Sequence, residues 1–345
     1  MNRDIRERPV ICSAPGRAGI IGNPTDMYGG SVLSCTVGMR AYARVQPGAG
    51  LMLETKGEVF RIAGREDLRP RGDPFDVGRA IVDYMGLPQL ECRVRYWSEI
   101  PPQSGMAGST ALVVAILQAL EAWQGRPLDR YRLAERARHI ELNHLKVVCG
   151  YQDAYMCTFG GLNYIDFRGK HFYRSEEAEL FATVEPLAQD VPTLPFLLAH
   201  TGVQHASGDV HRPIRERWLE GEKEVVNAYK RITDVARMGK KALILQDWAT
   251  LGRLMTENHA IQRDLGGSGE TNERLVAAAL AAGAPGAKLA GAGGGGTIIT
   301  LCPKNDTRSL ERTLRRAGAA DIYRLELAPG VTLAERERGA TGWAR

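Results

Sequence analysis

The chain has 345 residues, of which 44% are hydrophobic, and a formal net charge of +5. A chain of this length and ordinary composition predicts one large domain or two fused domains. The charges are spread rather than grouped in blocks, which argues against a nucleic-acid partner or a membrane surface. No apolar run reaches the roughly eighteen residues that a membrane span needs. The six cysteines form no Cys-x-x-Cys pair, so we expect buried free thiols in a reducing, cytoplasmic compartment.

Strand patterns dominate the first hundred residues. The first strand leads into a glycine-bearing stretch, residues 14–30, which reads APGRAGIIGNPTDMYGG, and we expect its Pro-Gly pair to break that strand. Alternation and β-branched residues predict strands at residues 10–13, 31–45, 51–62 and 91–97, and helical spacing predicts a helix at residues 74–85.

A second glycine-bearing stretch, residues 101–120, reads PPQSGMAGSTALVVAILQAL and predicts a turn followed by an apolar helix. Gly105 and Gly108 lack a Cβ, so the backbone can approach a ligand closely, and Ser109 and Thr110 are good residues to open a helix. Free N–H groups and the positive end of the helix dipole suit a phosphate, and the two hydroxyls lie where they can reach a phosphate-bound Mg²⁺. Taken alone, the stretch fits an ordinary helix start equally well.

The pattern of residues 128–148 predicts a helix, because apolar side chains gather on one side and Asp129 is suited to cap it. Glu141 lies in this helix, and Asp153 follows in the turn Gly-Tyr-Gln-Asp at residues 150–153. A lone glutamate on a helix is usually solvated, and Asp153 also suits the cap of a next helix. The local sequence pattern alone therefore assigns no chemical role to Glu141 or to Asp153.

A third glycine-bearing stretch, residues 288–297, reads KLAGAGGGGT and contains the spacing Gly-x-Gly-x-x-Gly. A dinucleotide fingerprint needs a strand before it and a helix after it. Here we expect a helix before and a β-rich run after, which disfavours a dinucleotide-dependent oxidoreductase. The charged tail after Pro329 is expected to fray. We predict strands at residues 161–167, 196–200, 297–302 and 321–327, and helices at residues 219–238, 248–265, 271–282 and 306–317.

In this order and at these distances, the three glycine-bearing stretches resemble the signature of the GHMP small-molecule kinases, which include galactokinase, homoserine kinase, mevalonate kinase and phosphomevalonate kinase. The resemblance covers nearly the whole chain. It implies an α+β fold of two domains with the site in the cleft between them, and ATP and Mg²⁺ as the ligands. The implied parts are a ribosomal-protein-S5-like N-terminal domain at residues 1–185, a C-terminal α/β sandwich at residues 186–330 and a tail at residues 331–345.

The resemblance assigns the catalytic residues by position. Arg17 matches the lysine or arginine that follows Pro-Gly in the first motif, where it would stabilise developing charge. Asp153 matches the catalytic aspartate, either as the base that takes the acceptor proton or as an electrostatic anchor, and the sequence leaves both open. Glu141 becomes a candidate Mg²⁺ ligand together with Ser109 and Thr110. The implied ATP-binding residues are Pro102, Ser104, Gly105, Met106, Ala107, Gly108, Ser109 and Thr110.

Two local features favour one branch of the family. Where many members read Gly-Glu-His, this chain reads Gly22-Asn23-Pro24, which departs from galactokinase and mevalonate kinase. The stretch GNPTDMYGG, and the run Val-His-x-x-x-Arg-x-Arg-Trp-Leu-x-Gly at residues 210–221, are similar to glucuronokinase. That similarity implies transfer of phosphate to the anomeric hydroxyl of D-glucuronate. The implied substrate-binding residues are Asn23, Asp26, Tyr28, Gly293, Gly294 and Arg215.

Other interpretations stay open. Asp26 also suits the turn in which it lies, and Arg212, Arg215 and Arg217 also suit a solvated helix face. The chain has no Walker A motif and no HRD or DFG motif, which excludes a P-loop NTPase and a protein kinase. A heptose-phosphate kinase, another sugar 1-kinase and a non-catalytic sugar or ATP sensor remain as alternatives. The expected partner is a small-molecule sugar or sugar acid, with the protein a monomer or a homodimer.

Overall fold

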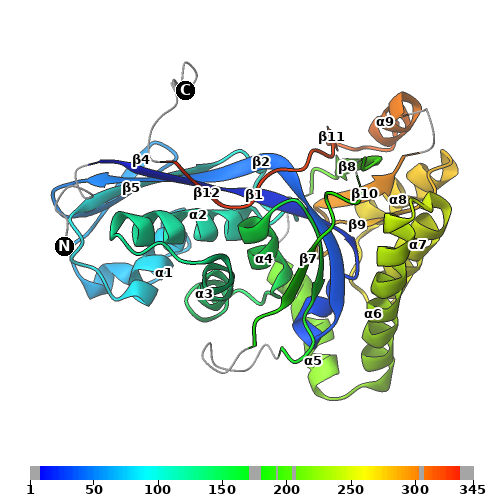
Figure 1. The fold of residues 1–345 in the computed structure, drawn as a ribbon, viewed down its shortest axis with the longest axis horizontal. Coiled ribbons are helices and arrows are strands. Elements are labelled where there is room, and N and C mark those ends of the chain that lie inside the picture. The colour runs from blue at the N-terminus through cyan, green and yellow to red at the C-terminus, as the bar shows by residue number, and fades with distance from the viewer. Residues whose placement is uncertain (1–7, 171–179, 192, 204–206, 303–306, 335–345) are drawn as a thin grey trace.

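The structure is a computed structural model that describes residues 8–170, 180–191, 193–203, 207–302 and 307–334. Two sheets, each covered by its own helices, lie along the long axis of the molecule (Figure 1). This arrangement confirms the predicted α+β fold. No helix in the described ranges combines the length and the apolar character that crossing a membrane requires.

The first sheet has the strand order β12-β1-β2-β5-β3-β4, and β6 and β7 branch from β2. All its pairs are antiparallel except that of β3 with β5. Its strands are β1 (Val10–Ile21), β2 (Ser31–Pro47), β3 (Leu51–Thr55), β4 (Glu58–Ile62), β5 (Cys92–Ser98), β6 (Leu162–Asp166), β7 (Thr183–Pro186) and β12 (Thr332–Ala334).

Four helices cover one face of this sheet (Figure 1). They are α1 (Asp76–Met85), α2 (Gly108–Trp123), α3 (Arg130–Asn143) and α4 (Gln152–Phe159). The central helix α2 is apolar nearly all round, as a helix buried between a sheet and other helices must be. Val113, Ile116 and Leu120 in it are fully buried in the main hydrophobic core. This packing fixes the direction of α2, and with it the place of its N-terminus.

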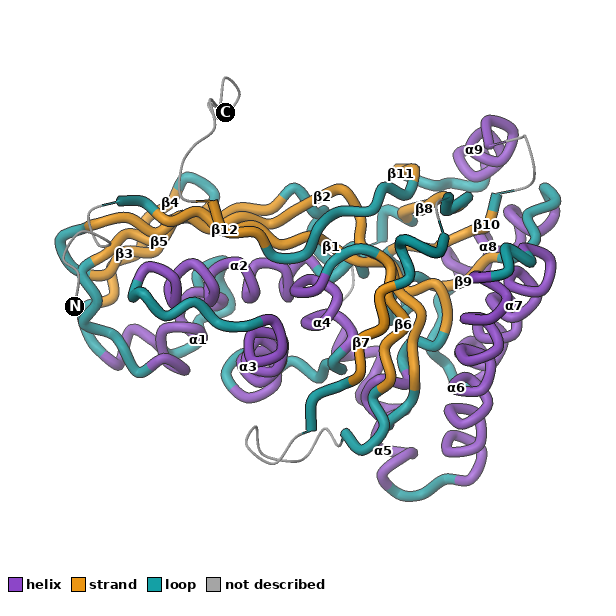
Figure 2. The backbone as a smooth tube through the Cα atoms, viewed as in Figure 1, coloured by secondary structure: helices purple, strands orange, loops and turns teal. Residues whose placement is uncertain are grey.

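The second sheet has the order β11-β8-β10-β9 and is antiparallel throughout. The long helices α6 and α7 stand beside one another against this half of the molecule, next to the part of the first sheet that β6 and β7 form (Figure 2). The elements are β8 (Phe196–His200), β9 (Ala287–Leu289), β10 (Thr297–Leu301), β11 (Asp321–Arg324), α5 (Ser207–Leu219), α6 (Lys223–Ile244), α7 (Trp248–Asp264), α8 (Glu270–Ala281) and α9 (Thr307–Arg316), and short 3₁₀ turns lie at η2 (Thr25–Tyr28) and η3 (Arg65–Leu68).

The predicted break at Pro15-Gly16 is wrong, because β1 continues through this pair to Ile21. The register with β2 shifts between Pro15 and Arg17, and such a bulge accommodates a proline without ending the strand. Gly16 is needed for packing here, since a Cβ on it would lie 2.7 Å from the carbonyl oxygen of Met106. The continued strand carries Arg17 to residues 102–110 of the second glycine-bearing stretch, which we call the phosphate loop, and its backbone N–H donates there to the carbonyl of Met106 at 3.1 Å.

Two further expectations need correction. The third glycine-bearing stretch is preceded directly by the short strand β9 rather than by a helix, and it joins β9 to β10 as an antiparallel hairpin. The strand that follows still excludes a dinucleotide fingerprint. The tail is not frayed at its start, since Thr332 to Ala334 pair with β1, and residues 335–345 lie outside the described part. The proposed domain limits at residues 185 and 330 stay predictions.

Candidate active site

A cavity of about 370 Å³ lies where the three glycine-bearing stretches meet. The first stretch contributes Arg17 and Asp26, the phosphate loop contributes Ser104 to Thr110 except Met106, and the third stretch contributes Gly291. The segment from the end of α3 to the start of α4 and two residues of α5 complete the wall. The volume falls within the range of small-molecule sites.

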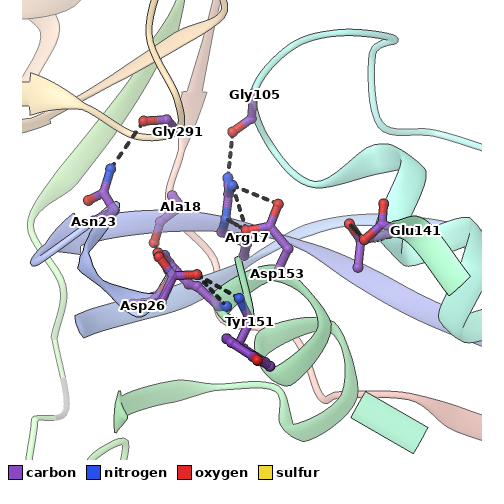
Figure 3. A network of polar contacts seen from close by, with 12 residues as sticks. Arg17, Ala18, Asn23, Asp26, Gly105, Glu141, Tyr151, Asp153 and Gly291 are labelled. Atoms are coloured by element: carbon purple, nitrogen blue, oxygen red, sulfur yellow. Dashed lines mark hydrogen bonds and ion pairs between the residues drawn. The ribbon is translucent and has the colours of Figure 1, made fainter. Parts of the chain in front are cut away.

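Arg17 and Asp153 form the central ion pair of this cavity (Figure 3). Nε and Nη2 of Arg17 donate to the two carboxylate oxygens of Asp153 at 2.7 and 2.8 Å, which is the two-pronged geometry that guanidinium and carboxylate favour. Nη1 of Arg17 donates to the carbonyl of Gly105 in the phosphate loop. Arg17 is only 7% exposed, whereas the Asp153 side chain is 29% exposed. Asp153 is thus the member of the pair that a ligand can reach.

Asp26 lies beside this pair and holds the start of α4. Its carboxylate accepts the backbone N–H groups of Tyr151 and Gln152 at 2.7 and 2.9 Å (Figure 3). Gly150 makes this approach possible, since a Cβ on it would lie 1.9 Å from Asp26 Oδ2. Burial raises the pKa of Asp26 to about 6, although the two N–H groups act in the opposite direction. Asp26 therefore lines the cavity and also positions the helix that carries Asp153.

The phosphate loop has the backbone shape of an anion cradle. Gln103, Gly105 and Ala107 all have positive φ values, which turn the chain sharply before α2 starts at Gly108. No side chain caps the first turn of α2, so the predicted role of Ser109 or Thr110 in opening the helix is not that of a cap. The N–H groups of that first turn are left for a ligand, as a phosphate site at a helix N-terminus requires.

Glu141 of α3 faces the phosphate loop from the other side. It is 4% exposed and accepts a hydrogen bond from Thr110 Oγ1 at 2.8 Å. Burial, and to a smaller extent the nearby Asp153 charge, raises the pKa of Glu141 to about 7. A divalent cation at this place would favour its ionised form.

The residues present fit Mg²⁺ bound together with a nucleotide. Oxygen donors suit this ion, which is commonly held by one or two carboxylates and the substrate phosphates. Glu141 and the hydroxyls of Ser109 and Thr110 supply such donors at the cavity wall. Within the described ranges, no cluster of three or more His, Cys, Asp or Glu side chains could hold a metal, so nucleotide phosphates would have to complete the coordination.

The third glycine-bearing stretch packs against the phosphate loop. Thr297 Oγ1 donates to the carbonyl of Ser104 at 2.8 Å. A Cβ on Gly291 would lie 2.5 Å from the carbonyl oxygen of Gly105, so only glycine allows this contact. Gly293 has a φ of 98° and packs against Gly267 instead of the phosphate loop. A Cβ on Gly293 would lie 1.8 Å from the carbonyl oxygen of Gly267.

Most predicted site residues line the cavity, and some do not. Tyr28 stacks on Tyr229, with ring centroids 4.5 Å apart, and lies in a separate apolar cluster with Trp218. Met106 is fully buried in the main core. The predicted residues absent from the described cavity wall are Pro102, Met106, Tyr28, Gly293, Gly294 and Arg215.

The cavity wall contains residues that the sequence did not assign to the site, although it named Arg212 beside Arg215 and Arg217. Lys146, after α3, and Arg212, on α5, are exposed cations on the wall. Neither side chain has an ion pair or a hydrogen bond within the described part of the chain. Arg217, in contrast, is bound by Glu222 at 2.8 and 2.6 Å. Gln103, Cys149, Gly150 and His211 also line the cavity. The sequence gave no signal that Lys146, Cys149 and His211 face the cavity, because this depends on how α5 and the α3–α4 segment are oriented.

Together, a loop with free backbone N–H groups, oxygen donors that suit Mg²⁺ and an arginine–aspartate pair match what the site of a small-molecule kinase needs. The sequence matches the model of the GHMP kinases N terminal domain at residues 76–161 and that of the GHMP kinases C terminal at residues 240–320. It also matches the galactokinase galactose-binding signature at residues 3–47. The chain belongs to the GHMP kinase family, whose members use ATP as a substrate, and the predicted family, fold and enzyme class are confirmed.

Its relatives differ in what they phosphorylate. The chain is 27% identical to Glucuronokinase 1 of Arabidopsis thaliana over 91% of each chain. It is also 27% identical to the mevalonate kinase of Methanothermobacter thermautotrophicus, over 84% of this chain and 89% of the relative. Among solved structures, the D-glycero-D-manno-heptose 1-phosphate kinase of Bacteroides thetaiotaomicron superposes with a TM-score of 0.72 at 21% identity, over 94% of this chain and 98% of the other.

Proposed function

We propose that the protein transfers the γ-phosphoryl group of ATP to a sugar, and that this sugar is D-glucuronate, phosphorylated at its anomeric hydroxyl. The observation that carries the proposal is the Arg17–Asp153 pair, which faces the same cavity as Glu141 and the phosphate loop. Phosphoryl transfer needs a phosphate cradle, a metal, a fixed positive charge and a group that orients the acceptor hydroxyl. The cavity wall offers a residue for each of these tasks.

In the proposed reaction, the backbone N–H groups of residues 105–110 bind the nucleotide phosphates, with Pro102 and Met106 supporting the loop from outside the cavity wall. Ser109, Thr110 and Glu141 would hold Mg²⁺, which would supply positive charge to neutralise the nucleotide phosphates. Asp153 receives the proton of the acceptor hydroxyl, or orients that hydroxyl. The oxygen of the acceptor hydroxyl bonds to the γ-phosphorus, and the bond between the γ-phosphorus and the oxygen of the leaving ADP breaks. An anomeric hydroxyl is more acidic than an ordinary alcohol, so an aspartate suits this task better than it would for other hydroxyls.

Arg17 has two functions in this scheme. It fixes the Asp153 carboxylate through two hydrogen bonds, and its charge lies beside the loop that would carry the transferred phosphoryl group. An arginine guanidinium carries a positive charge in proteins, so it can offset negative charge that develops on the transferred group. The pair therefore orients the acceptor and stabilises negative charge.

The acceptor is proposed to be a sugar acid because of the charges on the wall. Arg17 is committed to Asp153, and Arg217 to Glu222, which leaves Arg212 as the α5 arginine on the cavity wall. Arginine binds a carboxylate well, and Asp26 and Asn23 would bind sugar hydroxyls. Arg215, which the sequence favours for the carboxylate, stays an alternative from the same helix. Tyr28, Gly293 and Gly294 would support the acceptor from behind the wall.

A heptose-phosphate kinase is the second candidate, and the positive charges on the cavity wall favour it too. Two exposed cations, Lys146 and Arg212, line the cavity without a partner among the described residues, and a sugar phosphate would match them as well as a carboxylate. Both candidates therefore share an anionic acceptor.

The test is initial-rate turnover with MgATP and a panel of acceptors: D-glucuronate, D-galacturonate, D-galactose, a heptose 7-phosphate, mevalonate and homoserine. We expect ADP release with D-glucuronate and much slower release with galactose, its neutral counterpart in the panel. Turnover confined to the heptose phosphate would favour the second candidate. Nucleotide binding without turnover on any acceptor would contradict the proposal and favour a sensor.

Matched variants then show whether Arg212 or Arg215 binds the carboxylate of the acceptor. Arg212→Gln should raise the KM for the sugar acid at least ten-fold while the KM for ATP stays unchanged, because a salt-bridged hydrogen bond is replaced by a neutral one. Arg215→Gln serves as the control from the same helix. The reverse result, with only Arg215→Gln affected, would return the assignment to the residue that the sequence favours.

A further inference from the structure

Lys288 of β9 is a buried cation without a carboxylate partner. Its side chain is 1% exposed, and within the described part of the chain it forms no ion pair. The other two cations with such low exposure are paired: Lys170 with Glu135 at 2.8 Å, and Arg79 with Asp73 and Asp76. Burial, and to a smaller extent the charge of Arg17, lowers the pKa of Lys288 to about 7. A buried ammonium without a counter-ion costs free energy, so its place calls for an explanation.

The ammonium of Lys288 is directed at Asn23 of the first motif. Nζ donates to Asn23 Oδ1 at 2.7 Å and to the carbonyl of Leu289, and the carbonyl of Gly19 lies at 3.5 Å. Gly19 leaves room for this arrangement, because a Cβ there would lie 2.7 Å from Asn23 Oδ1. The ammonium is thus satisfied by oxygens that carry no formal charge.

Lys288 also determines which way the Asn23 amide points. An ammonium has only donors, so the amide must present Oδ1 to it and Nδ2 to the opposite side. On that side Nδ2 donates to the carbonyl of Gly291 at 3.1 Å (Figure 3). The amide is therefore clamped between two residues of the third glycine-bearing stretch. Replacing the ammonium by an apolar group would leave Oδ1 buried without its donor and remove the reason for this orientation.

The clamp is continuous with the catalytic pair. Gly291 packs on Gly105, whose carbonyl oxygen would be 2.5 Å from a Cβ on Gly291. The same carbonyl accepts a hydrogen bond from Arg17, and Arg17 holds Asp153. We propose that Lys288 is a positioning residue for phosphoryl transfer, which acts through Asn23 and Gly291 to set the place of Gly105 in the phosphate loop and of Arg17. The proposal rests on the kinase function proposed above, although nucleotide binding tests it separately.

The experiment is a double-mutant cycle with Lys288→Met and Asn23→Ala. The affinity for MgADP is measured by calorimetry, and kcat and KM are measured with MgATP and D-glucuronate. We expect each single change to weaken MgADP binding about five-fold or more and to lower kcat about ten-fold or more. Because both act along one chain of contacts, the double variant should lose little beyond the worse single variant. Arg79→Met, at a buried cation on α1, is the control: it should lower the melting temperature and leave MgADP affinity and kcat unchanged.

Asn23→Asp covers the case in which Lys288→Met does not fold. The new carboxylate pairs with the ammonium and preserves stability, but it no longer donates to the Gly291 carbonyl, so MgADP affinity and kcat should still fall. Lys288 would be a merely structural residue if its removal lowered the melting temperature as Arg79→Met does and left MgADP affinity unchanged. Additive losses in the cycle would equally overturn the proposal. A wild-type enzyme that binds MgADP but does not phosphorylate D-glucuronate would contradict the proposed function alone. The MgADP affinities of the double-mutant cycle would still decide the role of Lys288.

Discussion

Gly150→Ala gives a sharp test of the geometry around Asp26. The added Cβ would lie 1.9 Å from Oδ2 and 2.6 Å from Cγ of Asp26, so the carboxylate must leave the N–H groups of Tyr151 and Gln152. Hydrogen bonds to a charged group contribute ~1.5–3 kcal/mol each, and water can replace part of this. We therefore expect the free energy of unfolding in urea to fall by ~3 kcal/mol and the KM for the acceptor to rise. Gly150 has no positive φ, so backbone strain does not contribute to the loss.

The control is the same change in an Asp26→Ala background. Without the carboxylate, the remaining close atom is Met27 Cγ at 3.0 Å from the new Cβ, and a flexible methionine can move. Changes at contacting residues show coupling energies of ~0.5–3 kcal/mol. For Gly150→Ala and Asp26→Ala we expect a coupling energy at the upper end of this range. An equal cost of Gly150→Ala in both backgrounds would refute the reasoning, as would a Gly150→Ala enzyme with unchanged stability and unchanged acceptor KM.

Three other changes test single parts of the site. Asp153→Asn should keep its circular dichroism spectrum and lose ~10²–10⁴ in kcat; retention of most activity would contradict its role. Burial raises the pKa of Asp26 from 3.8 to about 6, so the stability that this group contributes is fully present below its unfolded pKa and is lost as pH rises through about 6. The melting temperature of Asp26→Asn relative to wild type should thus increase between about pH 4 and pH 7, and a constant difference would be inconsistent with the shift. Thr110→Val removes a hydroxyl that touches Glu141, and it should raise the Mg²⁺ concentration for half-maximal rate; an unchanged Mg²⁺ requirement would place the ion elsewhere.

Local patterns predicted the elements that local interactions stabilise. Asp129 caps α3 as expected, since its carboxylate accepts the N–H of Arg132 at 3.0 Å. The apolar run after Thr110 forms the buried helix α2. Contacts within a few residues determine both features, so the sequence around them is sufficient. The family resemblance assigned Arg17 and Asp153 to the site one by one, and their ion pair, which joins residues 136 positions apart, is a finding of the structure.

Features that depend on distant partners were missed. The strand β12 forms because β1 offers an edge to it, and Ser13 and Thr332 are 319 residues apart. The choice between Arg212 and Arg215 depends on which way α5 faces, and the charge pattern of that helix suits both. Lys288 looks like an ordinary residue at the start of a glycine loop, and only the position of Asn23 shows what it binds.

The central claim is that this site phosphorylates the anomeric oxygen of a sugar acid. Phosphorus NMR of a reaction that contains MgATP and D-glucuronate, with Asp153→Asn in a parallel tube, tests it most directly. We predict that wild-type enzyme forms ADP and one new phosphate ester whose phosphorus couples to the anomeric proton, and that the variant forms almost none. A phosphate on another hydroxyl, no ester with D-glucuronate, or an equal yield from Asp153→Asn would contradict the claim.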